Sequence, residues 1–279
     1  ALKGGFTYII DMPNNPTCPT ISVERLEDKI ERSAKAACDI GFHYGTDGNN
    51  CDSFPLVWGN PHVFGLKIYC NHTTGDLLID NPAPIFAAWS SEKPILAHAE
   101  GEKLEECIAL AKKYNRRLHV CHVSSISEID LIRKAPDTIT AGVTPHHLFL
   151  QSAHVKPAIT DAQEDLWEAL LDGTIDLVES DHAPHLKGEQ AYGVPGLETT
   201  VGLLLKKDKK SPLTKWLYEN PKKIFSIPDQ PDTFIELDPD KAYIAGSEGY
   251  ETKCGWSPFD GWELYGRVEK VVLYGKSIY

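Results

Sequence analysis

The sequence contains no long hydrophobic run and no excess of basic residues. A membrane-spanning helix needs ~18–20 consecutive apolar residues, and because no run approaches that length we expect no membrane segment. No basic stretch leads into an apolar stretch, so no signal peptide is expected within these residues. Lys and Arg number 28 against 40 Asp and Glu, a formal net charge of −12. This acidic balance argues against nucleic acid as a partner.

The cysteine pattern indicates no particular disulfide or metal-binding arrangement. The seven cysteines form an odd set without a CxxC pair, which favours neither a disulfide framework nor a zinc finger. Reduced thiols are typical of intracellular proteins, so we predict a cytoplasmic location. The chain opens on Ala1 rather than on methionine.

Short apolar runs alternate with longer amphipathic runs along most of the 279 residues. The runs predict strands at 7–11, 39–44, 64–69, 95–98, 118–122, 138–144 and 175–180. Helices are predicted at 22–38, 100–117, 125–134, 161–171, 197–207 and 213–225. This alternation indicates right-handed βαβ units around a parallel sheet.

Seven strands are one fewer than a closed (β/α)₈ barrel requires. From about residue 226 the sequence becomes rich in proline, with short β-type runs at 233–237 and 268–273. We therefore predict a TIM-type α/β barrel over residues 1–225 that lacks its first strand. Residues 226–279 are predicted to form a small C-terminal β appendage.

Side chains suited to metal binding stand near the ends of four predicted strands. They are Lys67, His98, His122 and Asp181. Barrel active sites lie at the C-terminal ends of the strands, and two imidazoles with a carboxylate suit Zn²⁺ or a similar ion. A buried lysine without a partner is costly, so Lys67 should be paired or modified. His119, three residues before His122, is expected on the opposite strand face and is interpreted as structural.

Eight segments carry a resemblance to a known family. They are DMPNNP at 11–16, GLKIYCNHTTGDL at 65–77, ILAHAE at 95–100, HVCHVSS at 119–125, TPHHLFL at 144–150, SDHAPH at 180–185, PGLET at 195–199 and WSPFDGWELYGRVEKVVLYGK at 256–276. In this order they resemble dihydroorotase, a cyclic amidohydrolase of pyrimidine biosynthesis. The type that they resemble most is a domain of the animal multifunctional pyrimidine enzyme.

The resemblance implies a function and a set of site residues. The reaction would be the reversible cyclisation of N-carbamoyl-L-aspartate to L-dihydroorotate by a metal-activated hydroxide. Lys67 would be carbamylated and would bridge two divalent ions, with zinc as the expected metal. His98 and His122 would bind the second ion, and Asp181 would bind the first and act as general base and acid.

The same resemblance implies substrate-binding residues. They are Asn14, Thr73, Thr74, Lys156, His185, Pro195 and Gly196. Asn14 has an equally good interpretation as part of a Pro-Asn-Asn turn. Lys156 stands where relatives often have arginine, so it keeps the charge and loses the bidentate fork. Thr73 and Thr74 match a loop that covers the substrate.

The sequence also departs from the family pattern. The family's His-x-His motif on the first strand is absent, since the first histidine is His43. The run at 7–11 corresponds to the family's second strand, so we expect the missing strand, motif and half of the appendage upstream of Ala1. The chain alone is then expected to show little activity. Gly142 stands where animal-type relatives can have an acidic ligand for an additional metal.

Two other functions compete with dihydroorotase. A non-catalytic dihydroorotase-like domain would serve structure or assembly, and a hydantoinase or allantoinase would share the barrel and metal ligands. His185 favours dihydroorotase over these hydantoinases, because it can donate to the carboxylate of dihydroorotate. As partners we expect the small-molecule substrate, with no nucleic acid and no membrane. Assembly into a homo-oligomer, or with other enzymes of the pathway, is also anticipated.

Overall fold

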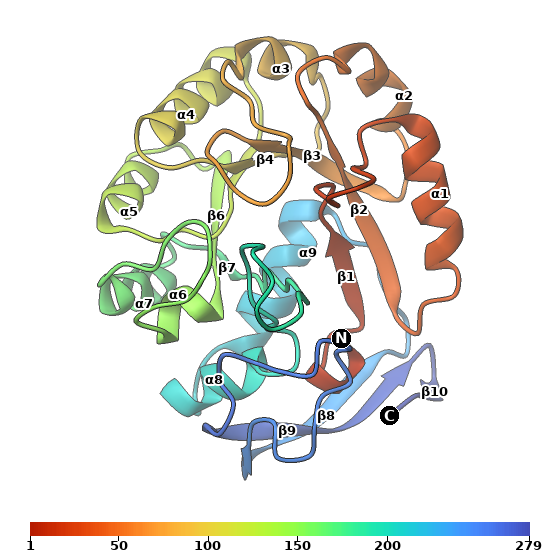
Figure 1. The fold of residues 1–279 in the computed structure, drawn as a ribbon, viewed down its shortest axis with the longest axis vertical. Helices are drawn as coiled ribbons and strands as arrows, with labels where there is room; N and C mark the ends of the chain where they lie inside the picture. The colour runs from red at the N-terminus through yellow and green to blue at the C-terminus, as the bar shows by residue number, and fades with distance from the viewer.

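The computed structural model describes all residues, 1–279. Seven parallel strands form one sheet in the order β1-β2-β3-β4-β5-β6-β7, curled as Figure 1 shows. Their bounds are β1 Tyr8–Asp11, β2 Asp39–Gly45, β3 Val63–Tyr69, β4 Ile95–His98, β5 Leu118–Val120, β6 Ile139–Val143 and β7 Leu177–Val178. Strands β1 and β7 are the two edges of this sheet. The predicted TIM-type barrel that lacks a strand is therefore confirmed.

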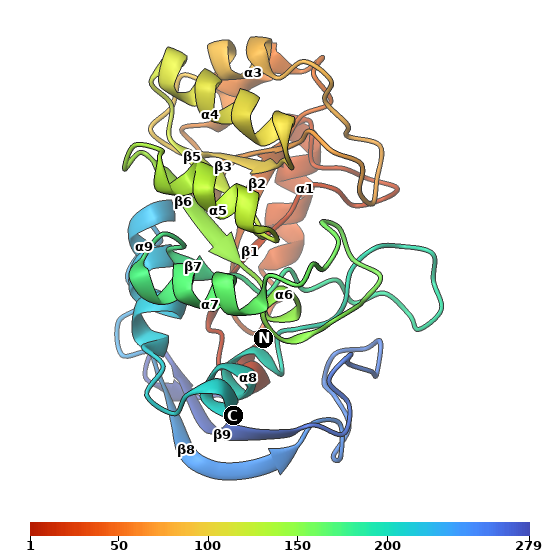
Figure 2. The same cartoon turned by 90° about the vertical axis from the view of Figure 1, so that its left-hand side faces the viewer.

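Helices follow the strands along the chain. They are α1 Val23–Ser33, α2 Phe54–Val57, α3 Ala83–Ala88, α4 Glu102–Tyr114, α5 Ile126–Arg133, α6 Pro145–Phe149, α7 Gln163–Asp172, α8 Thr200–Lys207 and α9 Asn220–Phe225. Those of the first half, such as α1, α3, α4 and α5, lie along the convex side of the sheet (Figures 1 and 2), whereas α8 and α9 follow its last strand and lead to the C-terminal segment. Three short single-turn elements, η1 Leu2–Gly4, η2 Cys51–Ser53 and η3 Lys215–Glu219, complete the set. No helix is both long and apolar enough to cross a bilayer.

Local sequence explains where the best-defined helices begin. Ser22 caps α1, and its hydroxyl accepts the Arg25 amide hydrogen at 3.3 Å. Ser125 caps α5 through a reciprocal capping box with Glu128. Because these side chains satisfy amide groups that have no partner within the helix, they fix the starting residues that the sequence predicted.

Two apolar clusters hold the barrel together. The larger contains 39 buried residues and joins the strands to helices such as α1, α4 and α7. The smaller joins Leu96, Cys121 and Leu177 of the strand regions to Ile224 and Phe225 of α9. The last turn of α9 thus packs against the sheet beneath the strand ends that carry the candidate site.

The C-terminal segment forms a separate antiparallel sheet in the order β10-β9-β8, below α8 in Figure 1. Its strands are β8 Phe234–Ile244, β9 Glu263–Leu273 and β10 Lys276–Ser277. Gly202 of α8 allows close packing, since a Cβ atom there would lie 2.3 Å from Tyr243 Oη of β8. The predicted β appendage is present, and its exact boundary at residue 226 stays a prediction.

Candidate active site

Four side chains predicted as metal ligands lie near the C-terminal ends of β3, β4, β5 and β7. Lys67 lies in β3, His98 ends β4, His122 follows β5 by two residues, and Asp181 follows β7 by three. Parallel pairing places Tyr69 of β3 opposite His98. The positive charge of Lys67 acts on both His98 and Asp181: it adds to the desolvation that lowers the pKa of His98, and it opposes the desolvation that raises the pKa of Asp181.

The two histidines point their rings at each other. His98 Nδ1 lies 3.0 Å from His122 Nε2, and both side chains are buried. Burial lowers the pKa of His98 to about 3 and that of His122 well below its usual value, so both rings are neutral at pH 7. Two nitrogens that bind one tetrahedral zinc at ~2.0–2.1 Å lie about 3.4 Å apart. The spacing and charge of this pair therefore fit a shared metal ion.

Lys67 is the most unusual member of the group. Its side chain is only 2% exposed. Its ammonium contacts Cys121 Sγ at 3.3 Å and the ring of Tyr69 at 4.8 Å, and neither partner is a carboxylate. A buried charge compensated this weakly is unfavourable, which fits a lysine that is modified when the site is assembled.

Asp181 is the titratable acid of the site. Desolvation, with repulsion from Glu179, raises its pKa to about 7, although the charge of Lys67 opposes the shift. Its side chain remains about one-third exposed, and its Oδ2 lies 3.9 Å from Nε2 of the buried His146. A carboxyl group with this pKa can take up and release a proton near neutral pH.

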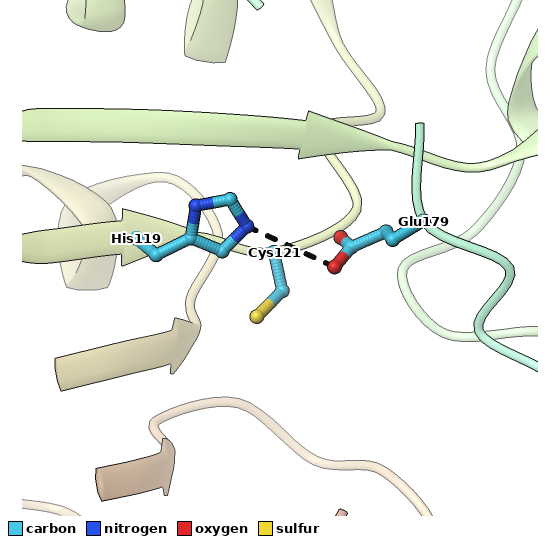
Figure 3. Close-up of side chains that lie close together, drawn as sticks. All are labelled: His119, Cys121 and Glu179. Carbon is cyan, nitrogen blue, oxygen red and sulfur yellow. Dashed lines mark ion pairs between the residues drawn. The ribbon is translucent and has the colours of Figure 1, made fainter. Parts of the chain in front are cut away.

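A second group lies next to these residues and consists of His119, Cys121 and Glu179 (Figure 3). Their potential ligand atoms lie within 4.8 Å of one another, a spacing that could hold a metal ion. His119 Nε2 is 3.8 Å from Glu179 Oε2, and its ring packs on Phe225 at 5.1 Å. His119 therefore lies on the same side of the sheet as Cys121 and the site.

The prediction that placed His119 on the face opposite the site residues was wrong. Alternation of side chains applies only while the backbone stays extended. The strand β5 ends at Val120, and His122 has φ 41°. The left-handed backbone at His122 turns its side chain out of the alternation, so counting residues from His122 does not give the orientation of His119.

Gly142 of β6 leaves room for Glu179. A Cβ atom at position 142 would lie 2.9 Å from Cδ and Oε1 of Glu179. Oε1 of Glu179 also accepts the His122 backbone N–H. In this chain a carboxylate of the neighbouring strand region thus occupies the space beside position 142.

The predicted substrate residues lie on loops that follow the strands. Asn14 donates a hydrogen bond from Nδ2 to the Thr74 carbonyl at 3.3 Å, joining two of these loops. Gly196 donates its backbone N–H to His182 Nδ1 at 3.1 Å, and Pro195 is buried beside it. No hydrogen bond or ion pair engages the half-buried Thr73 side chain within the described residues 1–279.

His185 and Lys156 approach the mouth from different loops. His185 Nδ1 lies 3.6 Å from Glu189 Oε2. The backbone carbonyl of His185 accepts the indole N–H of Trp256, in the C-terminal segment, at 2.8 Å. The charge of Lys156 acts on both His98 and Glu100: it adds to the desolvation that lowers the pKa of His98, and it opposes the desolvation that raises the pKa of Glu100.

Two residues of the site, Cys121 and Glu179, were not predicted from the sequence. Counting back two residues from Asp181 would not have found Glu179, because β7 ends at Val178 and the left-handed backbone at Asp181 interrupts the alternation. For the adjacent His146 and His147, the sequence left open which of the two reaches the mouth of the barrel. Of the two adjacent histidines, His146 faces Asp181, whereas both ring nitrogens of His147 are occupied by Thr144 Oγ1 at 2.8 Å and the Pro157 carbonyl at 3.1 Å.

No protein-family model matches the chain, but individual proteins do. The whole chain is 37% identical to part of the "Multifunctional protein CAD" of Squalus acanthias and spans 14% of that protein. It is 30% identical to the "Dihydroorotase" of Thermococcus kodakarensis over 100% of the chain and 76% of that enzyme. Among solved structures, the "Inactive dihydroorotase-like domain of Chaetomium thermophilum CAD-like multifunctional protein" superposes with a TM-score of 0.81. That match is 26% identical and covers 99% of this chain and 85% of the other.

The family assignment rests on the Thermococcus kodakarensis dihydroorotase, because the 30% identity extends over the whole of this chain and 76% of that enzyme. The alignment leaves no part of the present chain unmatched, from the β1 region to the C-terminal sheet. The chain belongs to the dihydroorotase family.

Proposed function

We propose that this protein is a dihydroorotase that interconverts N-carbamoyl-L-aspartate and L-dihydroorotate in pyrimidine biosynthesis. The main support is the placement of Lys67, His98, His122 and Asp181 at the ends of β3, β4, β5 and β7, in a chain of this family. A domain that had lost catalysis would have no chemical reason to retain a neutral histidine pair beside a buried lysine and a carboxyl group of raised pKa.

We propose two divalent ions, most simply zinc, as the cofactors. His98 and His122 would bind one ion, Asp181 would bind the other, and a carbamate on Lys67 would bridge them. When bound, the ions would supply Lewis acidity that polarises a carbonyl and lowers the pKa of water. Conversion of Lys67 to a carbamate would also remove a buried positive charge that has no carboxylate partner.

Asp181 is proposed to move the proton. In the ring-opening direction its carboxylate would accept a proton from the attacking water. As the ring C–N bond breaks and the water oxygen joins the carbonyl carbon, Asp181 would give that proton to the leaving nitrogen. Burial of this carboxyl group raises its pKa, which favours uptake of the proton before it is passed to the nitrogen.

The loop residues are proposed to bind the substrate. Lys156, His185 and Asn14 would interact with its carboxylate, which a cation and two hydrogen-bond donors can neutralise. The backbone at Pro195 and Gly196 would contact the ring, and Thr73 and Thr74 would cover it. We also propose a cytoplasmic protein that associates with other pyrimidine-pathway enzymes or with further copies of itself.

The direct test uses the full-length gene product that contains this sequence. We expect about two divalent ions per chain by elemental analysis and turnover of dihydroorotate in a spectrophotometric assay. Mass spectrometry at neutral pH should show a carbamate on Lys67. Full metal loading with no turnover in either direction would contradict the proposed activity.

A second candidate is a non-catalytic dihydroorotase-like domain. Its support is the similarity to the fungal domain described as inactive, at 26% identity. For this candidate we expect the metal-loaded full-length protein to lack turnover while its removal impairs assembly with partner enzymes. The same assay therefore separates the two functions.

A further inference from the structure

Three loops meet at one tyrosine above the strand ends. The Tyr192 backbone N–H donates to Thr74 Oγ1 at 2.9 Å, and the Thr74 hydroxyl donates to the Tyr192 carbonyl at 3.3 Å. The next residue, Gly193, donates its N–H to the His154 carbonyl at 2.9 Å. Tyr192 therefore joins its own loop after β7 to the loop after β3 and to the loop after α6.

The ring of Tyr192 makes two further contacts with the loop after α6. It stacks on the His154 ring, with centroids 4.5 Å apart and planes 25° apart. The Lys156 ammonium lies over the same ring at 5.7 Å from its centroid. An aromatic face attracts a cation without removing the hydrogen atoms that the cation can donate. Lys156 is thus held while its ammonium stays available to an anion.

The need for such a contact follows from the side chain itself. A lysine ammonium is a point charge on a flexible stem, whereas an arginine presents a planar fork that is already oriented. Holding a flexible cation before the ligand arrives reduces the ordering cost of binding. The stacked His154 ring orients the Tyr192 ring, and the two Thr74 hydrogen bonds fix the Tyr192 backbone that carries it.

We propose that Tyr192 is a positioning residue, which holds the Lys156 ammonium in place to receive the substrate carboxylate. This inference rests on the proposed function, because it takes an anionic substrate as the ligand of Lys156. Tyr192 need not touch the reacting atoms. Its loss should weaken substrate binding and leave the chemical step nearly unchanged.

The test compares variants of the full-length gene product with dihydroorotate as the substrate. Tyr192→Leu removes the ring, and we expect KM to rise about two- to fivefold, the size of a partly exposed cation–π contact, with kcat within twofold. Tyr192→Phe keeps the aromatic face, so this variant should have the wild-type KM. In a Lys156→Gln background, Tyr192→Leu should have no additional effect on KM.

A matched control is available on another part of the molecule. Lys222 lies over the ring of the exposed Tyr218 at 5.3 Å, in the η3–α9 region. Tyr218→Leu removes an equivalent contact and should not change KM. If Tyr192→Leu raised KM equally with and without Lys156, or lowered kcat alone, the positioning role would be wrong.

Calorimetric titration with dihydroorotate separates this proposal from the proposed function. A protein that binds dihydroorotate without converting it would contradict the proposed dihydroorotase activity. In that case a two- to fivefold rise in Kd for Tyr192→Leu would still support the positioning role. An unchanged Kd would overturn that role. A wild-type protein that neither binds nor converts dihydroorotate would overturn both.

Discussion

Replacing Gly142 with alanine tests the tight packing beside the candidate site. The added methyl group would lie 2.9 Å from the Glu179 carboxylate and 3.0 Å from Leu177 Cδ1. These separations are shorter than normal van der Waals contact. Glu179 cannot move away freely, since its Oε1 accepts the His122 backbone N–H and its Oε2 faces His119 at 3.8 Å.

The size of the effect follows from two opposing contributions. Inserting a methyl group into a filled interior costs about 1–3 kcal/mol. Alanine has less conformational freedom than glycine in the unfolded chain, and this difference stabilises the folded protein by about 0.4–1 kcal/mol. With the middle of each range, the net loss is about 1.3 kcal/mol of unfolding free energy, or roughly 2 °C in Tm for a chain of 279 residues.

Thermal unfolding at a fixed scan rate measures this loss, with Gly59→Ala as the control. No atom outside its chain neighbours lies within 4 Å of a Cβ atom built at Gly59, so Tm should not fall. Because Glu179→Ala removes the clashing group, the double variant should lose less stability than the sum of the two single variants. An unchanged Tm for Gly142→Ala, or strictly additive losses, would refute the packing argument.

Three further outcomes are expected. Asp181→Asn in the full-length protein should reduce turnover by about 10²–10⁴-fold with little change in Tm, as expected for loss of a general acid and base; near-normal rates in the steady-state assay would remove Asp181 from this role. Desolvation tends to raise the pKa of Glu198, but hydrogen bonds from Thr252 and neighbouring groups outweigh it and lower the pKa. A lowered carboxyl pKa stabilises the fold above the unfolded value of 4.5, and this stabilisation is lost as the pH falls through the folded pKa. The Tm deficit of Glu198→Gln should therefore be full above about pH 5 and shrink as the pH falls below 4.5, and a deficit independent of pH would contradict the assignment. Ser125→Ala removes the capping hydroxyl of α5 and should cost about 1 kcal/mol in denaturant unfolding, whereas Ser127→Ala on the same helix should cost less.

The sequence predicted the parts of the fold that depend on local pattern. The predicted bounds of all seven barrel strands agree with the observed bounds to within a few residues, because each strand is a short apolar run in a chain where such runs alternate with amphipathic ones. The short helices α2, α3 and α6 were not predicted, since four to six residues do not complete two turns of helical periodicity. The strand β8 extends to Ile244 rather than 237, and it is stabilised by pairing with β9 more than by its own composition.

The candidate site was predictable as a set of residue types but not as a set of contacts. Lys67, His98 and Asp181 could be placed at strand ends from the sequence alone. The relation between Gly142 and Glu179 could not, because it joins two strands whose register and separation depend on the whole sheet. Tyr192 gave no signal for the same reason, as its partners Thr74 and His154 lie on other loops.

The backbone at two proposed metal ligands explains why their orientation escaped sequence reasoning. His122 and Asp181 both have φ 41°, in the left-handed region that few non-glycine residues adopt. Such a conformation costs of order 1 kcal/mol or more and persists only where the surrounding structure enforces it. At His122 the enforcing contact is visible, since its backbone N–H donates to Glu179. The carboxylate admitted by Gly142 thus helps hold the left-handed turn that aims His122 at His98, and the spacing of glycine, glutamate and histidine along the chain gives no indication of this dependence.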